Sequence, residues 1–241
     1  MKIYYFLISI LITAYLFSCN SNQEHNQKEP SGYDLHKLKK SGIGVITIKE
    51  EALSKGETTF DFFNKKDLSS RLGKVDYYKI EDKSIAKPIY YKPDANICYF
   101  ICTGWDPQRY YVLANPESEE ESFLKLDTTL YRFIPWDYII LSAGKVIRVN
   151  PENNPVIDRP SKYGKEVDWH DKNQKEFIVK EIYKKWVKVQ HAAGQEEGWI
   201  VWVDNEKFWI DLPKPLIQPL GKLQKWKDPS AQPQNFQPKY N

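Results

Sequence analysis

Residues 176–182 read Glu-Phe-Ile-Val-Lys-Glu-Ile, residues 186–190 read Trp-Val-Lys-Val-Gln, and residues 198–202 read Gly-Trp-Ile-Val-Trp. These runs are short, rich in β-branched and aromatic residues, and alternate with a period of two, as at Val187 and Val189. Such alternation between turn residues predicts β-strands rather than helices. The stretch from 176 to 202 is therefore expected to form three consecutive antiparallel strands.

The rest of the folded region has the same character. Residues 45–50 alternate with a period of two, and residues 58–63 form another run rich in β-branched and aromatic side chains. Helices are expected only at 64–72, with Asn64 as a possible N-cap, and in one turn at 171–176. Many short strands without alternating helices predict an all-β protein built from small barrels or sandwiches.

An internal repeat organises these strands. Four sequence anchors recur in the same order at offsets of 63–67 residues. Regular self-similarity of this kind predicts duplicated structural units. The matched pairs are 92–94 with 159–161, 110–113 with 177–180, 123–126 with 186–189, and 133–136 with 199–202.

The segment from Glu176 to Trp202 resembles the bacterial SH3 (SH3b) family. The resemblance rests on a strand ending in a turn, the Trp-Val-Lys-Val strand, a polar hairpin, and Gly-Trp-Ile at 198–200, with Pro160-Ser161 before them. It covers residues 150–212 well and residues 80–149 less well, because Phe133 lacks a preceding Gly. It implies tandem small barrels of about five strands each, which bind peptidoglycan peptides or an envelope partner protein without catalysis.

The amino terminus has the form of a secretory signal peptide. Lys2 precedes the apolar run 3–17, and a helix of that length rises ~22 Å, less than the ~30 Å hydrocarbon core of a bilayer. The run ends in Leu16-Phe17-Ser18-Cys19, which resembles a bacterial lipobox, although Phe17 is larger than the residue preferred there. The resemblance implies that Cys19 is lipidated and holds the protein on an envelope membrane, with the outer membrane expected. A transmembrane anchor, or an ordinary signal peptide with Cys19 incidental, are the alternatives.

Two further segments are expected to lie outside the barrels. Residues 20–33 contain no apolar anchor and predict a tether, whereas the last 29 residues hold six of the 15 Pro and cannot join a central strand. This tail is either loose or packs along a barrel through residues such as Leu216 and Leu220. The expected plan is a lipoprotein signal peptide at 1–18, lipidated Cys and tether at 19–41, a first unit with extra strands at 42–149, a second unit at 150–212, and the tail at 213–241.

Composition and motifs argue against several activities. The 35 Lys and Arg balance 32 Asp and Glu, so no strong field favours nucleic acid. Cysteine peptidases that accompany SH3b units need a thiolate beside a His base, but Cys98 and Cys102 lie in an apolar, strand-like run. Ligand spacing for a metal and cofactor-binding loops are not found. The sequence therefore predicts no catalysis, no cofactor and no metal.

Aromatic side chains remain as candidates for binding. Rings that point outward from strands can stack on sugars or pack against peptides. Because Trp199 and Trp202 lie three residues apart on one strand, we expect one of them to face outward. The candidate ligand-binding residues are Trp105, Tyr111, Trp136, Tyr138, Trp199 and Trp202.

The sequence thus predicts a membrane-anchored envelope lipoprotein that acts as a non-catalytic binding or scaffolding module. Two other interpretations stay open. One is an envelope hydrolase with an unrecognised pair of carboxylates, and the other is a structural subunit of an outer-membrane complex.

Overall fold

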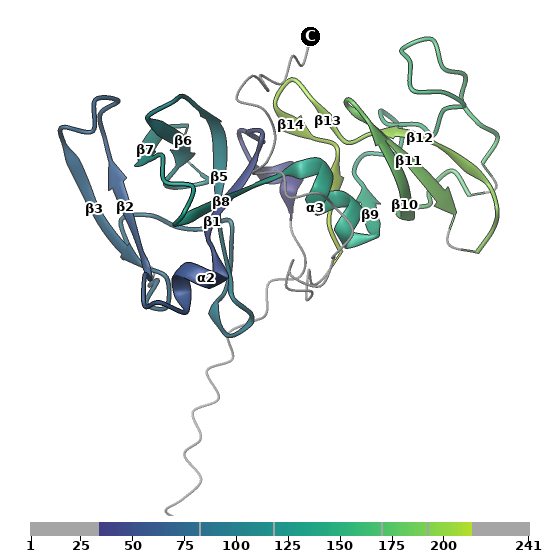
Figure 1. Cartoon of the computed structure of the whole chain (residues 1–241). Coiled ribbons are helices and arrows are strands. Elements are labelled where there is room, and N and C mark those ends of the chain that lie inside the picture. Colours follow the sequence, from purple (N-terminus) through teal and green to yellow (C-terminus); the bar gives the residue numbers. More distant parts are fainter. Residues whose placement is uncertain (1–33, 82, 118, 170, 192, 214–241) are drawn as a thin grey trace, which may run out of the picture. The chain divides into compact units, whose positions relative to one another are not determined.

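The computed structural model describes residues 34–213 except for 82, 118, 170 and 192 (Figure 1). Its larger sheet is antiparallel, with the strand order β3-β2-β7-β6-β5-β1-β8 and with β4 paired to β5. The strands are β1 (Gly44–Ile48), β2 (Thr59–Phe63), β3 (Arg71–Asp76), β4 (Tyr90–Lys92), β5 (Ile97–Trp105), β6 (Arg109–Leu113), β7 (Glu121–Lys125) and β8 (Tyr131–Pro135).

The second sheet has five antiparallel strands in the order β12-β11-β10-β9-β15. A separate two-stranded pair, β13 with β14, lies between β12 and β15 in the sequence. The strands are β9 (Lys145–Arg148), β10 (Glu176–Tyr183), β11 (Trp186–His191), β12 (Glu197–Val201), β13 (Val203–Asp204), β14 (Lys207–Phe208) and β15 (Ile210–Asp211).

Helices are short in the described residues. They are η1 (Leu35–Lys37), α2 (Glu50–Leu53), η2 (Pro93–Ala95) and α3 (Trp136–Ala143). The predicted helix at 64–72 is wrong: this segment turns between β2 and β3, with the Asn64 N–H bonded to the Ser70 carbonyl, and β3 begins at Arg71. Residues 171–176 form a turn before β10, closed by the Gln174 N–H on the Asp171 carbonyl.

The all-β prediction is confirmed, but the two halves differ in strand pairing. Three of the four repeat anchors fall on β6, β7 and β8 in the first half and on β10, β11 and β12 in the second. The first anchor spans the end of β4 and part of η2 at 92–94 but lies in a loop at 159–161. Whereas β12 pairs with β11, β8 pairs with β1 and not with β7. The last anchor also differs, because Trp136 begins helix α3 and Trp202 follows β12. The repeat in sequence is therefore not a repeat of strand order.

Two central strands of the larger sheet are buried on both faces. All five residues of β1 are buried, with Val45 in one apolar cluster and Ile46 in another. Along β5, Tyr99 joins the first cluster and Phe100 the second. Because successive side chains of a strand point to opposite faces, alternate residues feed two separate cores.

The cluster that contains Val45 and Tyr99 is shared between the sheets. It includes Phe177 of β10 and Val187 of β11, both with no exposed surface. Residues at the sheet-to-sheet junction complete it, among them Trp136 of α3 and Phe208 of β14. The two sheets therefore form a common core rather than two independently buried barrels.

The folded region begins before residue 42, and its second sheet begins before residue 150, both earlier than predicted. Leu35 is 1% exposed and belongs to the shared core, so residues 34–41 are not part of a tether. Strand β9 pairs with β10 and β15, so the second sheet begins at Lys145 rather than after residue 149. Both shifts follow from apolar side chains, Leu35 and Val146, that are buried in this core.

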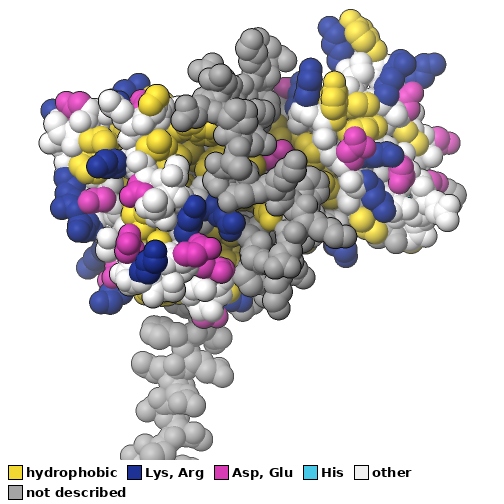
Figure 2. Space-filling view, viewed as in Figure 1, with side chains coloured by type: hydrophobic (Ala, Val, Ile, Leu, Met, Phe, Trp, Pro, Cys, Tyr) yellow, Lys and Arg dark blue, Asp and Glu magenta, His cyan; other side chains and the backbone are white. Residues whose placement is uncertain are grey.

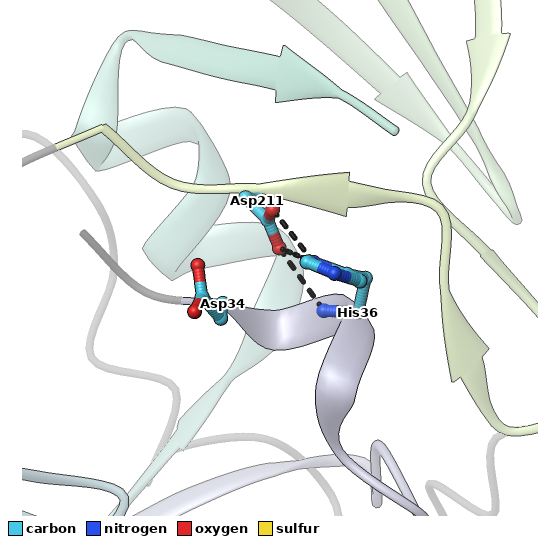
Figure 3. A group of neighbouring side chains, drawn as sticks. All are labelled: Asp34, His36 and Asp211. Atoms are coloured by element: carbon cyan, nitrogen blue, oxygen red, sulfur yellow. Dashed lines mark hydrogen bonds and ion pairs between the residues drawn. The ribbon is translucent and has the colours of Figure 1, made fainter. Parts of the chain in front are cut away.

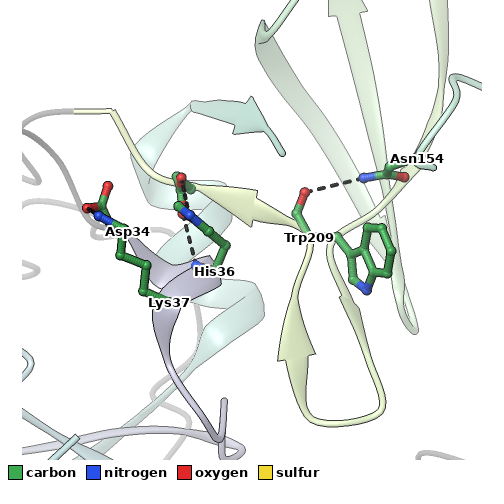
Figure 4. Close-up of polar contacts among 6 residues, drawn as sticks. Asp34, His36, Lys37, Asn154 and Trp209 are labelled. Atoms are coloured by element: carbon green, nitrogen blue, oxygen red, sulfur yellow. Dashed lines mark hydrogen bonds and ion pairs between the residues drawn. The ribbon is translucent and has the colours of Figure 1, made fainter. Parts of the chain in front are cut away.

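Two buried polar residues fix the connections of the second sheet. Asn154 donates to the Trp209 carbonyl at 3.3 Å (Figure 4). It also donates to the Val201 carbonyl at 2.9 Å and accepts from the Val201 N–H. It thus joins the end of β12 to the segment before β15. Arg148 donates to the carbonyls of Asn154, Lys172 and Gln174, which holds the long connection between β9 and β10.

Gly198 gives a test of how closely residues 156 and 157 pack against β12. A Cβ at this position would lie 2.3 Å from Val156 Cγ1 and 3.1 Å from the Ile157 carbonyl oxygen. We expect Gly198→Ala to lower the free energy of unfolding by about 1–3 kcal/mol, the cost of overpacking a core. Urea denaturation measures the change.

The matched control is Gly194→Ala, because the nearest atom to a Cβ there is 3.7 Å away. That variant should stay within about 0.5 kcal/mol of the parent protein. Equal stability of the two variants would show that Val156 does not pack against β12 as described.

Candidate functional site

An aromatic face on β10, β11 and β12 is the strongest candidate for a binding site. In the strand register Tyr183 lies opposite Trp186, which lies opposite Val201. The next row of the same face places Lys188 opposite Trp199. Directly opposed residues of antiparallel strands project from the same face of the sheet. We call the group Tyr183, Trp186, Lys188, Trp199 and Val201 the outer aromatic face.

Burial shows which way this face points. Val187, Val189 and Ile200, which alternate with it along β11 and β12, have no exposed surface. The outer aromatic face must therefore point away from the shared core. Its members are half-buried except Tyr183, which is 49% exposed.

A neighbouring loop borders the face beside Trp199. Ile157 and Trp199 exchange backbone hydrogen bonds of 2.9 and 2.8 Å, so both side chains project from the same face. Gly164 packs directly on Ile157, since a Cβ at Gly164 would lie 2.8 Å from Ile157 Cδ1. The loop between 157 and 166 therefore borders Trp199 through Ile157, which is 7% exposed.

Charged groups frame the rings. The Lys188 ammonium lies 2.6 Å from a carboxylate oxygen of Glu197. The hydrogen bond from Lys188 lowers the pKa of Glu197, and the same bond raises the pKa of Lys188. Lys184 places its ammonium 5.7 Å from the centre of the Tyr183 ring. The face thus combines apolar rings with charged groups among and beside them, which suits a ligand that has both apolar and charged parts.

Two predicted binding residues are instead core residues. Trp136 is 3% exposed and donates its indole N–H to the Ser41 carbonyl at 2.7 Å. Trp202 is 2% exposed and donates its indole N–H to the Lys184 carbonyl at 2.7 Å. Both rings contact Phe208, with centroid distances of 5.0 and 6.1 Å. The structure therefore removes Trp136 and Trp202 from any exposed binding surface.

The other predicted residues do not form one surface. Trp105 is half-buried and packs on Phe133 at 5.0 Å between ring centroids. Trp105 pairs with Tyr110, so Tyr111 projects from the opposite face of β6. The Tyr111 hydroxyl donates to Asp106, and the largest cause of its raised pKa is this hydrogen bond. Tyr138 lies on α3 and packs against the shared core.

Of the six predicted residues, Trp199 alone lies on the outer aromatic face. Sequence reasoning passed over Trp186 and Tyr183 as binding residues. The signal for Trp186 was available, because it alternates with the buried Val187 in the same way as Lys188 does. The signal for Tyr183 was available too, because a two-residue turn at Lys184-Lys185 places Tyr183 directly opposite Trp186.

The body's two cysteines are buried in β5. Cys98 and Cys102 are free thiols with no exposed surface. Burial raises the pKa of Cys98, and it raises that of Cys102 to about 12. A thiol of this kind stays protonated at neutral pH and is a poor nucleophile.

One side-chain group could hold a cation. Asp34, His36 and Asp211 each offer a ligand-type atom, and these atoms lie within 4.8 Å of one another (Figure 3). The His36 Nδ1 lies 2.9 and 2.7 Å from the two Asp211 carboxylate oxygens. The backbone N–H of His36 also donates to the Asp211 carboxylate. Lys37 pairs with Asp34 (Figure 4), and its hydrogen bond is the largest cause of the lowered pKa of Asp34. These bonds already account for the grouping, which joins η1 to β15.

Comparisons with known proteins add no assignment. Protein-family models, curated protein sequences and solved structures gave no match to this chain. Within the described part of residues 34–213, none of the helices has the length and apolar character needed to cross a membrane.

The buried thiols give a test of their accessibility and protonation state. Protein carrying Cys19→Ser, whose only thiols are Cys98 and Cys102, should release almost no thionitrobenzoate from Ellman's reagent at pH 8 while folded. The high pKa values leave almost no thiolate at that pH. Adding denaturant should make both thiols react at once. Rapid stoichiometric reaction of the folded protein would mean that β5 exposes a reactive cysteine.

Proposed function

We propose that this chain is a lipid-anchored protein of the bacterial cell envelope that binds a cell-wall peptide or a partner protein without catalysis. The outer aromatic face of β10, β11 and β12 is the binding surface in this proposal. The half-buried rings of Trp186 and Trp199 on the outward side of the sheet, with the exposed Tyr183 beside them, are the observation that carries it.

The chemistry of the face favours a peptide or glycopeptide. Trp and Tyr rings bind apolar side chains and sugar faces while their N–H or O–H groups remain hydrated. The Lys188–Glu197 pair offers both a donor and an acceptor at the border of the rings. Peptidoglycan stem peptides carry carboxylates, an amine and small apolar side chains, which matches this mixed surface.

The backbone beneath the face supports the SH3b resemblance. Five antiparallel strands in the order β12-β11-β10-β9-β15 form a small sheet. In it β15, the last of these strands in the sequence, pairs with β9, the first. A small barrel of about five strands is what the family resemblance implies. The rings project from the middle and one edge of this sheet, where paired strands hold their positions.

The membrane anchor is proposed from sequence alone. Cys19 and the apolar run before it lie outside the described residues, as does most of the Pro-rich tail. Lipidation at Cys19 would tether the folded body, which begins at η1, close to the membrane and to the cell wall.

Binding to purified peptidoglycan sacculi tests the proposal. We expect Trp199→Ala and Trp186→Ala each to weaken sedimentation of the soluble protein with sacculi by about tenfold, because each change removes one stacking ring. Tyr111→Ala, a ring on the other sheet, is the control and should bind as the parent does.

Each variant is first checked for an unchanged unfolding temperature, so that loss of fold is not mistaken for loss of binding. Sacculi that bind none of the proteins would leave a partner protein as the ligand, to be sought by crosslinking at Trp199. Retention of sacculus binding by both Trp variants, or its loss in Tyr111→Ala, would refute the outer aromatic face as the site.

A further inference from the structure

Strand β3 is an open edge of the larger sheet. It stands at one end of the strand order and pairs only with β2 among the described strands. The Tyr77 N–H donates to the Thr58 carbonyl at 2.6 Å, so residues 58 and 77 form a hydrogen-bonded pair. Since such pairs alternate along antiparallel strands, Val75 also faces β2 and Lys74 directs its N–H and C=O away from it.

Those outward groups are available to a further strand. The described hydrogen bonds assign no partner to the N–H or C=O of Lys74 on this side. The Asp76 carbonyl is taken by the Lys79 N–H, which ends the open stretch at that point. An unpaired edge with exposed backbone groups is the template used when an extended peptide adds to a sheet.

Exposed apolar side chains lie on β3 and in the segment that follows it. Leu72 is 40% exposed, Tyr78 46% and Ile85 44%. Ile85 lies against Gly73, since a Cβ there would be 2.6 Å from Ile85 Cδ1. These three are the majority of the large apolar side chains that the described residues expose, the other two being Tyr163 and Tyr183.

The charge around β3 indicates what kind of strand would bind. Lys74 is exposed on β3, and in the segment after it the exposed Lys79, Lys83 and Lys87 outnumber the exposed Glu81. The carboxylate of Asp76, also on β3, accepts a hydrogen bond from the Tyr78 N–H. Figure 2 shows Lys and Arg side chains along the edge where β3 lies in Figure 1. Arg71 is already paired with Asp61. A second copy of the chain would bring the same lysines against one another, whereas an acidic strand would neutralise them.

We propose that β3 is a second binding site, which takes an extended acidic segment of a partner protein as an added antiparallel strand. The segment hydrogen-bonds to the backbone at Lys74. Its carboxylates project on the face of β3 that carries Lys74, and its alternate apolar side chains project on the other face, where Ile85 lies against Gly73. This site is distinct from the outer aromatic face and does not depend on the function proposed for it.

The test uses a fluorescent heptapeptide of alternating Glu and Val, with a Lys and Val peptide as the charge control. Fluorescence anisotropy should show that the acidic peptide binds at least tenfold more tightly than the basic one. The same acidic peptide with N-methyl groups on the amides of one edge should lose binding, because it keeps its charge but cannot pair as a strand.

The protein variant is Lys74→Pro, which removes the outward N–H without removing a bond between β2 and β3, because proline is tolerated at a sheet edge. We expect Lys74→Pro to weaken the acidic peptide at least tenfold and Lys74→Ala, which keeps the N–H, to weaken it less. Amide hydrogen exchange of the parent protein should slow at Lys74 when the peptide is bound.

Several results would overturn the proposal. They are the absence of binding, equal binding of the N-methylated peptide, unchanged binding to Lys74→Pro with no protection of the Lys74 amide, and loss of peptide binding in Trp199→Ala. Concentration-dependent dimerisation that Lys74→Pro abolishes would instead assign the edge to a second copy of the chain, and would also overturn it.

Discussion

The fold depends on strands β1 and β5 being buried on both of their faces. Alternate residues of these strands feed two clusters, one enclosed by the larger sheet and one shared with the second sheet. In the shared cluster Phe208 contacts the rings of both Trp136 and Trp202, and each indole N–H is bonded to a carbonyl of a neighbouring segment. Burial of three such rings removes a large apolar area from water, so the two sheets stabilise one another.

This shared core determines which aromatic side chains remain available. Rings that fill the junction between the sheets cannot also bind a ligand, and the second sheet is left with one face toward water. Trp186 and Trp199 are held there by paired strands whose inward residues are fully buried. A surface of this kind is already ordered before a ligand arrives, which lowers the entropic cost of binding. The open edge at β3 is a different type of surface, because it offers backbone groups rather than rings.

Local sequence patterns predicted the strands well and their partners poorly. Alternation around Val187 correctly indicated β11. Ile200 and Trp202 lie two residues apart, so both are expected on the same face, and both are buried. Helix α3 was missed because Trp136–Ala143 is short and largely apolar, with little polar face to reveal a helical period. The pairing of β8 with β1 joins residues far apart in the sequence, and no local signal encodes it. The repeat in sequence therefore suggested a symmetry that the long-range pairing does not follow.

The central claim is that the rings of Trp186 and Trp199 bind the ligand while the buried rings only stabilise the fold. An NMR titration of the indole N–H signals with soluble muropeptides tests it most directly, after each signal is assigned by single Trp→Phe variants. We expect the signals of Trp186 and Trp199 to shift in a saturable manner and those of Trp136 and Trp202 to stay in place. Saturable shifts at Trp105 with none at Trp186 and Trp199 would contradict the account.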